Sequence, residues 1–267
     1  MIPPSEISRL AHRLGLSDRT IEKDYVLTWV LFAIADSPLR GLLAFKGGTA
    51  IKKVYAPGYR FSEDLDFTLL EPMTSNEDVI SAVERLFPWL KREVNLTVAV
   101  RKVEVHSSDN PTIYLNYIGP LQGDLASRFL KVDFTRDEEL VFPLQEKPLQ
   151  VPYSDCKGRI ATLLVYSPEE ILAEKLRSLL TRTEPRDLYD VHYMFTNRLA
   201  DFENMVFNMR PKFESKGLAV NDLRTILTQR GPTFDRLWEP RLRGQVPEVP
   251  PLENVIRETN RLLQRFL

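Results

Sequence analysis

The segment RFSEDLDF, residues 60–67, holds the residue pattern with the clearest chemical use. In a strand, side chains two positions apart share a face, so Asp64 and Asp66 stand side by side while Leu65 and Phe67 point into the core. The Cα atoms of the two acids then lie about 7 Å apart. Like charges at that range raise a carboxyl pKa unless a cation lies between them. Mg²⁺ suits such oxygen ligands, because it keeps waters and takes its other ligands from substrate phosphates.

A third acid lies on another expected strand, LKVDF at residues 130–134. Its apolar residues alternate inward, and Lys131 and Asp133 fall on the opposite face. Two or three strand-borne acids around Mg²⁺ are what phosphoryl or nucleotidyl transfer requires. We therefore predict that Asp64, Asp66 and Asp133 hold the metal. The alternative is a set of solvated acids on an exposed strand face, since a two-residue motif often arises by chance.

A glycine turn precedes the acid pair in FKGGTAIKKVY, residues 45–55. An apolar strand meets Gly47 and Gly48 and then a helix, an order that brings backbone N–H groups and the positive helix end close to an anion such as phosphate. The alternative is a tight turn that uses glycine for backbone freedom alone. Between Ser37 and Ser62 the chain has no acidic residue, and its five basic residues form a candidate polyanion patch: Arg40, Lys46, Lys52, Lys53 and Arg60.

The helix expected over residues 169–180 carries a charge inside its apolar face. Lys175 lies between Ile171 and Leu179 around the helix. A buried ammonium without a partner is costly, so Lys175 either extends its stem to solvent or meets an anion, such as a nucleotide phosphate or a site carboxylate.

The next expected helix, over residues 185–195, repeats this pattern with acids. Asp187 falls between apolar positions and Asp190 lies at their border. The alternative is an acid that stabilises the helix N-terminus and pairs locally with Arg182 or Arg186.

Composition excludes several classes of protein. The net charge is −1, so no molecule-wide basic field drives nucleic-acid or membrane binding. One cysteine, Cys156, and three histidines exclude a zinc site and a disulfide. The start MIPPSEISRL lacks a charged region followed by an apolar stretch, and the apolar run at residues 26–35 is too short to span a membrane. We therefore expect a cytoplasmic protein that does not bind membranes.

The elements that position these residues are mixed. We expect helices in the first forty residues, with Ser5 and Ser17 as N-caps, and again at 76–92. Strands are expected at 42–45, 61–70, 95–106, 112–118 and 128–134, and one within ELVFPLQ at 139–145. Helices open at the capping box of residues 167–170 and at Pro185, and a last one follows residues 247–251. The fold class is α/β (α+β) with a mixed sheet, and a boundary near residue 160 separates a mainly helical C-terminal portion.

Four motifs in this order resemble the AbiEii/AbiGii family of nucleotidyltransferase-like toxins, which includes the MenT toxins. They are KGGTA (46–50), RFSEDLDF (60–67), KVDF (131–134) and EKLRSLLTRTEPRDLYDV (174–191). The stretch EKDYVLTWVL, residues 22–31, also looks like that family. The resemblance extends from about residue 20 to residue 195, and four ordered motifs are far more specific than any one of them.

The resemblance implies a DNA polymerase β-like nucleotidyltransferase core at residues 1–160 and a mainly helical domain at 161–267 that closes the cleft. It implies Mg²⁺ and a nucleoside triphosphate, and a toxin of a type IV-like toxin–antitoxin or phage-defence system with a cognate antitoxin. Some toxins of the family transfer nucleotides to the 3′ acceptor end of tRNA.

Carried over position by position, the resemblance and the basic patch assign three sets of residues. The nucleotide-binding set is Lys46, Gly47, Gly48, Thr49, Arg60, Ser62 and Lys175. The metal set is Asp64, Asp66 and Asp133. The catalytic set is Asp64, Asp66, Lys175, Asp187 and Asp190.

Two other functions stay open at this point. In one, the chain is a non-catalytic module that binds a nucleotide or a partner, and the acids hold a structural Mg²⁺ or pair with Arg60 and Lys175. In the other, the nucleotide is transferred to a small molecule or to a protein hydroxyl.

Overall fold

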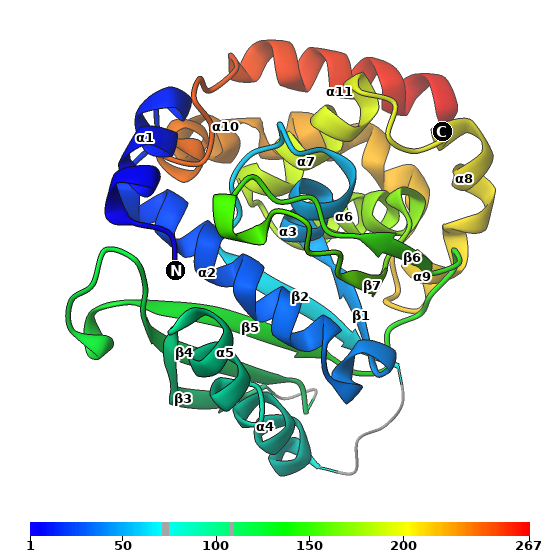
Figure 1. Ribbon diagram of the computed structural model, residues 1–267. Helices are drawn as coiled ribbons and strands as arrows, with labels where there is room; N and C mark the ends of the chain where they lie inside the picture. Colours follow the sequence, from blue (N-terminus) through cyan, green and yellow to red (C-terminus); the bar gives the residue numbers. More distant parts are fainter. Residues whose placement is uncertain (71–74, 107–108) are drawn as a thin grey trace. The chain divides into compact units, whose positions relative to one another are not determined.

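The computed structural model describes residues 1–70, 75–106 and 109–267. The chain forms two compact units. Unit 1 comprises Met1–Glu138 and Gln145–Val165, and unit 2 comprises Glu139–Leu144 and Tyr166–Leu267. The elements of both units are labelled in Figure 1. The domain division at residue 160 stays a prediction.

A seven-stranded mixed sheet forms the centre of unit 1. Its strand order is β3-β4-β5-β2-β1-β7-β6. The strands are β1 (Leu43–Lys46), β2 (Asp64–Leu69), β3 (Thr97–Val105), β4 (Pro111–Ile118), β5 (Phe129–Thr135), β6 (Gln145–Pro148) and β7 (Thr162–Val165). The pairs β2–β5 and β1–β7 are parallel, and the other neighbours are antiparallel. The mixed α/β fold predicted from the sequence is confirmed.

Alternation along the central strands separates two faces. The inner face is apolar and almost fully buried, with Leu65 and Phe67 of β2, Ile113, Leu115 and Tyr117 of β4, and Leu130, Val132 and Phe134 of β5. We call the opposite face the outer face. Asp64 and Asp66 belong to it and are half-buried. Period-two patterning therefore aims the acid pair away from the core, as predicted.

The helices of the N-terminal part are α1 (Pro4–Leu14), α2 (Asp18–Ala35), α4 (Asn76–Glu84) and α5 (Phe87–Val94). Helices α2, α4 and α5 cover the inner face, and α1 packs against α2. In Figure 1, α2, α4 and α5 lie on the same side of strands β3, β4, β5 and β2. Ser17 caps α2 by accepting a hydrogen bond from the Thr20 amide. The predicted cap at Ser5 is wrong, because α1 begins at Pro4, after Pro3, and Ser5 lies inside it.

Three other expectations about elements need correction. ELVFPLQ forms no strand, and β6 begins at Gln145, where that segment ends. Strand β7 was not predicted. The helix expected at 76–92 is two helices, α4 and α5, which meet where Pro88 enters the first turn of α5.

The elements of unit 2 are helices. They are α6 (Pro168–Thr181), α7 (Pro185–Thr196), α8 (Phe202–Asn208), α9 (Arg210–Glu214), α10 (Leu223–Leu242) and α11 (Leu252–Phe266). Ser167 caps α6 by accepting from the Glu170 amide, and Pro185 opens α7, both as predicted. Helix α7 packs against α6, α10 and α11. Across the described ranges of the chain, we find no helix with the length and apolar character that a membrane crossing requires.

Candidate active site

The acid pair lies on β2 between two strands that carry other predicted site residues. Across the antiparallel pair with β1, Asp66 faces Lys46. Across the parallel pair with β5, Asp66 faces Asp133 and Asp64 faces Lys131. Because directly paired residues of neighbouring strands share a face, the three predicted metal ligands all lie on the outer face.

The glycine turn is built against the acid pair. Helix α3 (Gly47–Ala50) begins directly after β1 and continues as a π-helical turn over Ile51–Tyr55. Gly47 has a φ of 77°, and a Cβ placed on it would overlap the Asp66 carboxylate. A Cβ on Gly48 would lie 2.8 Å from Arg60 Nη2 and 3.2 Å from Ser62 Oγ. Gly47 is therefore required by its positive φ and by the closeness of Asp66, and a side chain on Gly48 would displace Arg60.

Thr49 joins the glycine turn to the strand that carries the acids. Its side chain is fully buried, and its hydroxyl donates to the Asp64 carbonyl oxygen at 2.5 Å. The hydroxyl thus joins the start of α3 to the start of β2, and it contacts the backbone of the acid pair.

The five basic residues predicted as one polyanion patch divide into different environments. Lys46 and Arg60 are almost fully buried beside the glycine turn. Arg40 is exposed and pairs with Glu146 at 3.7 Å. Lys53 is buried and binds Asp24 of α2 at 2.6 Å. The expectation of one polyanion patch is therefore wrong for Lys53, whose charge is taken up by Asp24, and for Lys52, whose ammonium donates to the carbonyls of Pro57 and Tyr59.

Asp133 is held by two neighbours on the outer face. Its Oδ1 accepts from the Thr112 hydroxyl at 2.5 Å, and its Oδ2 accepts from Lys131 Nζ at 2.6 Å. Over residues 1–70, 75–106 and 109–267, no group of three or more His, Cys, Asp or Glu side chains is arranged to hold a metal. Asp64, Asp66 and Asp133 thus share a face here without forming a three-acid ligand group.

Lys131 lies close to the acids of β2 and β5. Burial alone would lower the pKa of Lys131, but its hydrogen bond to Asp133 and the charges of Asp133, Asp64 and Asp66 raise the pKa. The sequence indicated that Lys131 shares a face with Asp133, but it did not identify the ion pair between them. Thr112 was missed, because its pairing with Asp133 depends on the β4–β5 register.

The remaining predicted residues form a charged cluster in unit 2. Lys175 of α6 pairs with Asp187 at 2.8 Å and with Asp190 at 3.0 Å, and both acids of α7 are buried. Lys175 therefore meets carboxylates, one of the two outcomes predicted for a charge on an apolar helix face.

Arg182 closes this cluster. Its Nε donates to Asp187 Oδ2 at 2.7 Å. Burial alone would raise the pKa of Asp187, but the charge of Lys175 and the hydrogen bond and charge of Arg182 outweigh it and lower the pKa. Asp187 is therefore an ionised acid between two cations.

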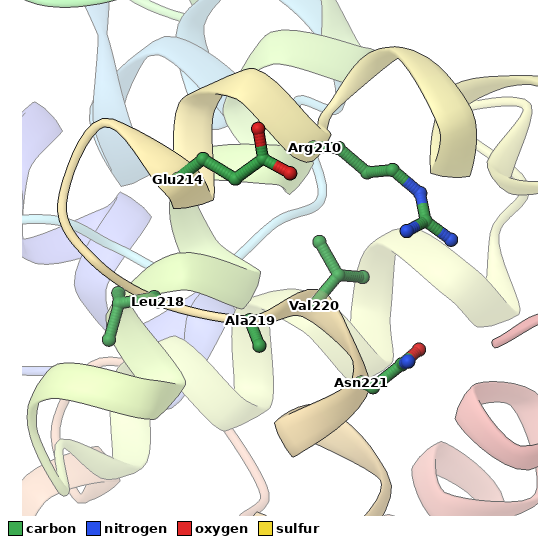
Figure 2. Close-up of a pocket in the computed structure, with 6 residues that line it drawn as sticks. All are labelled: Arg210, Glu214, Leu218, Ala219, Val220 and Asn221. Atoms are coloured by element: carbon green, nitrogen blue, oxygen red, sulfur yellow. The ribbon is translucent and has the colours of Figure 1, made fainter.

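A pocket of about 130 Å³ lies elsewhere in unit 2, between α9 and the turn before α10. Figure 2 shows its lining residues: Arg210, Glu214, Leu218, Ala219, Val220 and Asn221. None of them belongs to the predicted site.

The family follows from comparison with known proteins. A family model described as nucleotidyl transferase AbiEii toxin, type IV toxin–antitoxin system, matches residues 29–264. The chain belongs to the AbiEii family. This AbiEii protein is accordingly a nucleotidyltransferase of the toxin type, as its motifs predicted.

Solved structures show the same fold. MenT4, a nucleotidyltransferase toxin from Mycobacterium tuberculosis, superposes with a TM-score of 0.70 at 20% identity, over 99% of this chain and 90% of its own. JHP933 from Helicobacter pylori superposes with a TM-score of 0.55 at 18% identity, over 94% and 93% of the two chains. A search of curated proteins gives no match.

Proposed function

We propose that this AbiEii nucleotidyltransferase transfers a nucleotide from a nucleoside triphosphate to a hydroxyl at the 3′ end of tRNA, with Mg²⁺ held by Asp64 and Asp66. One observation carries the proposal. The glycine turn at Gly47 and Gly48 packs directly on Asp66, Arg60 and Ser62, so backbone amides, a cation and an acid meet at one place, as a metal-bound triphosphate requires.

The donor set fits the metal. Two carboxylates on one strand face, beside half-buried polar groups, supply the hard oxygen ligands that Mg²⁺ takes from proteins. When bound, Mg²⁺ would hold the triphosphate and neutralise its developing charge. Asp133 lies across from Asp66, and we assign it the third position once its pairing with Lys131 rearranges.

The chain's own residues then orient the reaction. Lys46, Arg60 and Ser62 bind the phosphates beside the turn. The acceptor hydroxyl attacks the α-phosphorus and gives its proton to solvent. A new P–O bond forms, and the bond to the bridging oxygen breaks so that pyrophosphate leaves. We propose that Lys175 takes part in catalysis as a positioned cation, because Asp187 and Asp190 hold its ammonium in place.

The toxin family supports the biological setting. A type IV toxin–antitoxin system implies a cognate antitoxin. We propose that the protein acts in the cytoplasm, where tRNA and triphosphates are available, and that blocking tRNA contributes to phage defence.

Labelled nucleotides test the proposal directly. Wild-type protein is incubated with each α-³²P-labelled triphosphate, total RNA and cell lysate, with and without EDTA, and the labelled fraction is identified. We expect label at tRNA 3′ ends, no label with EDTA, and at least a hundredfold lower transfer for Asp64→Asn and Asp66→Asn. Removing one electrostatic contact to the reacting groups costs about 10²–10³ in rate.

Asp235→Asn is the matched control, because Asp235 is an exposed acid on α10. It should transfer at the wild-type rate. Transfer by Asp64→Asn at the wild-type rate, with folding intact by circular dichroism, would refute the role of the acid pair. Label in protein or in small molecules would refute the tRNA acceptor.

A further inference from the structure

The outer face of the sheet continues from the acid pair across three more strands. The β2–β5 register places Asp64 beside Lys131, the β4–β5 register places Lys131 beside Tyr114, and the β3–β4 register places Tyr114 beside Lys102. One row of side chains therefore crosses the sheet from β2 to β3 on the face that carries the acids. Three strand spacings make this row about 14 Å long.

Aromatic rings and cations lie together along this row. The ring centroids of Tyr114 and Phe129 are 5.7 Å apart. Lys102 Nζ lies 4.2 Å from the Tyr114 centroid, and the Arg101 guanidinium lies 4.9 Å from the Phe129 centroid. We call Arg101, Lys102, Tyr114, Phe129 and Lys131 the platform.

The platform is most open at Phe129 and at the two cations of β3, while Tyr114 and Lys131 are half-buried. Phe129 is 39% exposed, whereas its neighbour Leu130 on the inner face is fully buried. Arg101 and Lys102 are exposed as well. The β-bulge between Val100 and Lys102 adds one residue to β3, and this allows Arg101 to reach the Phe129 ring on the outer face.

One of the three platform cations, Arg101, is not neutralised by an acid of the described residues, whereas the other two are. Lys102 pairs with Glu104 and Lys131 pairs with Asp133, each at 2.6 Å. The Arg101 guanidinium, in contrast, forms no ion pair with any residue in the described part of the chain. Arg101 is thus a cation stacked on an exposed ring, ready to meet a phosphate.

We propose that the platform binds the single-stranded end of a nucleic-acid acceptor and leads its terminal hydroxyl to Asp64 and Asp66. The inference rests on the proposed nucleotidyl transfer and names the surface that takes the acceptor. Exposed rings stack bases without regard to sequence, and neighbouring cations bind the backbone. The length also fits, because about 14 Å accommodates about four stacked nucleotides at 3.4 Å each.

A single strand suits this surface better than a duplex does. The rings of Phe129 and Tyr114 can stack only on bases whose faces are accessible, and paired bases within a duplex are stacked on each other. The net charge of −1 also gives no broad basic field for a duplex backbone.

Binding is measured without triphosphate, so that it does not depend on catalysis. The probes are a fluorescein-labelled single-stranded RNA of eight nucleotides, the same RNA in a duplex, and heparin as a competitor. We expect Phe129→Ala and Arg101→Ala each to weaken single-strand binding about tenfold, the loss typical of one base stack. Phe207→Ala and Arg243→Ala are matched controls, because Phe207 is 79% exposed and Arg243 is 77% exposed, both in unit 2.

Transfer assays separate the two proposals. Platform variants should raise the KM for the RNA acceptor about tenfold, with unchanged triphosphate affinity and unchanged thermal midpoint, whereas Asp64→Asn should abolish transfer and keep RNA binding. Equal single-strand binding by wild type and Phe129→Ala would overturn the platform, as would preference for the duplex or transfer to a protein. If wild type binds the single strand through the platform but transfers no nucleotide, the proposed function fails and the binding surface stands.

Discussion

At the scale of single residues, Lys52 connects the π-helical turn after α3 to the loop that precedes Asp64 and Asp66. Its Nζ donates to the Pro57 carbonyl at 3.2 Å and to the Tyr59 carbonyl at 2.8 Å, and it lies 3.8 Å from the Phe61 centroid. Burial lowers the pKa of Lys52 from 10.5 to about 8, with Asp24 opposing the shift and the positive charges of Lys53 and Arg60 adding to it.

This depressed pKa predicts a pH-dependent stability. Between pH 8 and pH 10.5 the unfolded chain binds more protons than the folded one at Lys52, so the free energy of unfolding rises with pH there, by about 3 kcal/mol in total. Lys52→Met should lack this rise. Urea unfolding of wild type and variant across this range checks it, with exposed Lys216→Met as the control. Parallel curves for wild type and Lys52→Met would contradict the burial of a charged Lys52.

At the scale of elements, the start of α3 has no room for a side chain. In Gly47→Ala the new Cβ would overlap the Asp66 carboxylate, and the positive φ would cost an L-residue about 1–2 kcal/mol. We expect a rise in the triphosphate Kd and at least a tenfold loss of transfer, because Asp66 must move. Gly41→Ala is the control, since a Cβ there meets nothing within 4 Å. Wild-type transfer by Gly47→Ala would show that the turn does not determine the position of Asp66.

The elements also show what sequence patterns can predict. Alternation placed Asp64 and Asp66 on one face, and the capping box located the start of α6, because both signals are local. The burial of Lys53 could not be predicted, since its partner Asp24 is on another helix and only the folded chain brings them together. Strand β7 has four residues, too few for alternation to identify it.

At the scale of the whole molecule, the chain passes between the two compact units more than once. Residues 139–144 belong to unit 2, although the chain then returns to unit 1 for β6 and β7. The sequence analysis predicts a strand within ELVFPLQ, but Glu170 of α6 accepts hydrogen bonds from the amides of Val141 and Phe142. The backbone of residues 139–144 is therefore bonded to Glu170, which lies 28 or more residues further along the chain. A pattern within the segment itself cannot predict such a contact.

Glu170 joins the two pieces of unit 2, which are Glu139–Leu144 and Tyr166–Leu267. Its other oxygen pairs with Lys212 of α9 at 2.8 Å, both side chains are fully buried, and Lys212 also donates to the Glu139 carbonyl at 2.8 Å. Glu170→Gln leaves a buried cation without its counter-charge and should cost about 3–5 kcal/mol. Hydrogen exchange should rise in peptides from 139–144 and 166–214, whereas half-buried Glu169→Gln should leave it unchanged.

The double variant Glu170→Gln with Lys212→Met should recover most of the lost stability. The amide oxygen of the new glutamine still accepts from the amides of residues 141 and 142, and the buried cation is gone. If the double variant exchanges as fast as the single one, the ion pair does not hold the segment, and packing around α6 and α9 must do so.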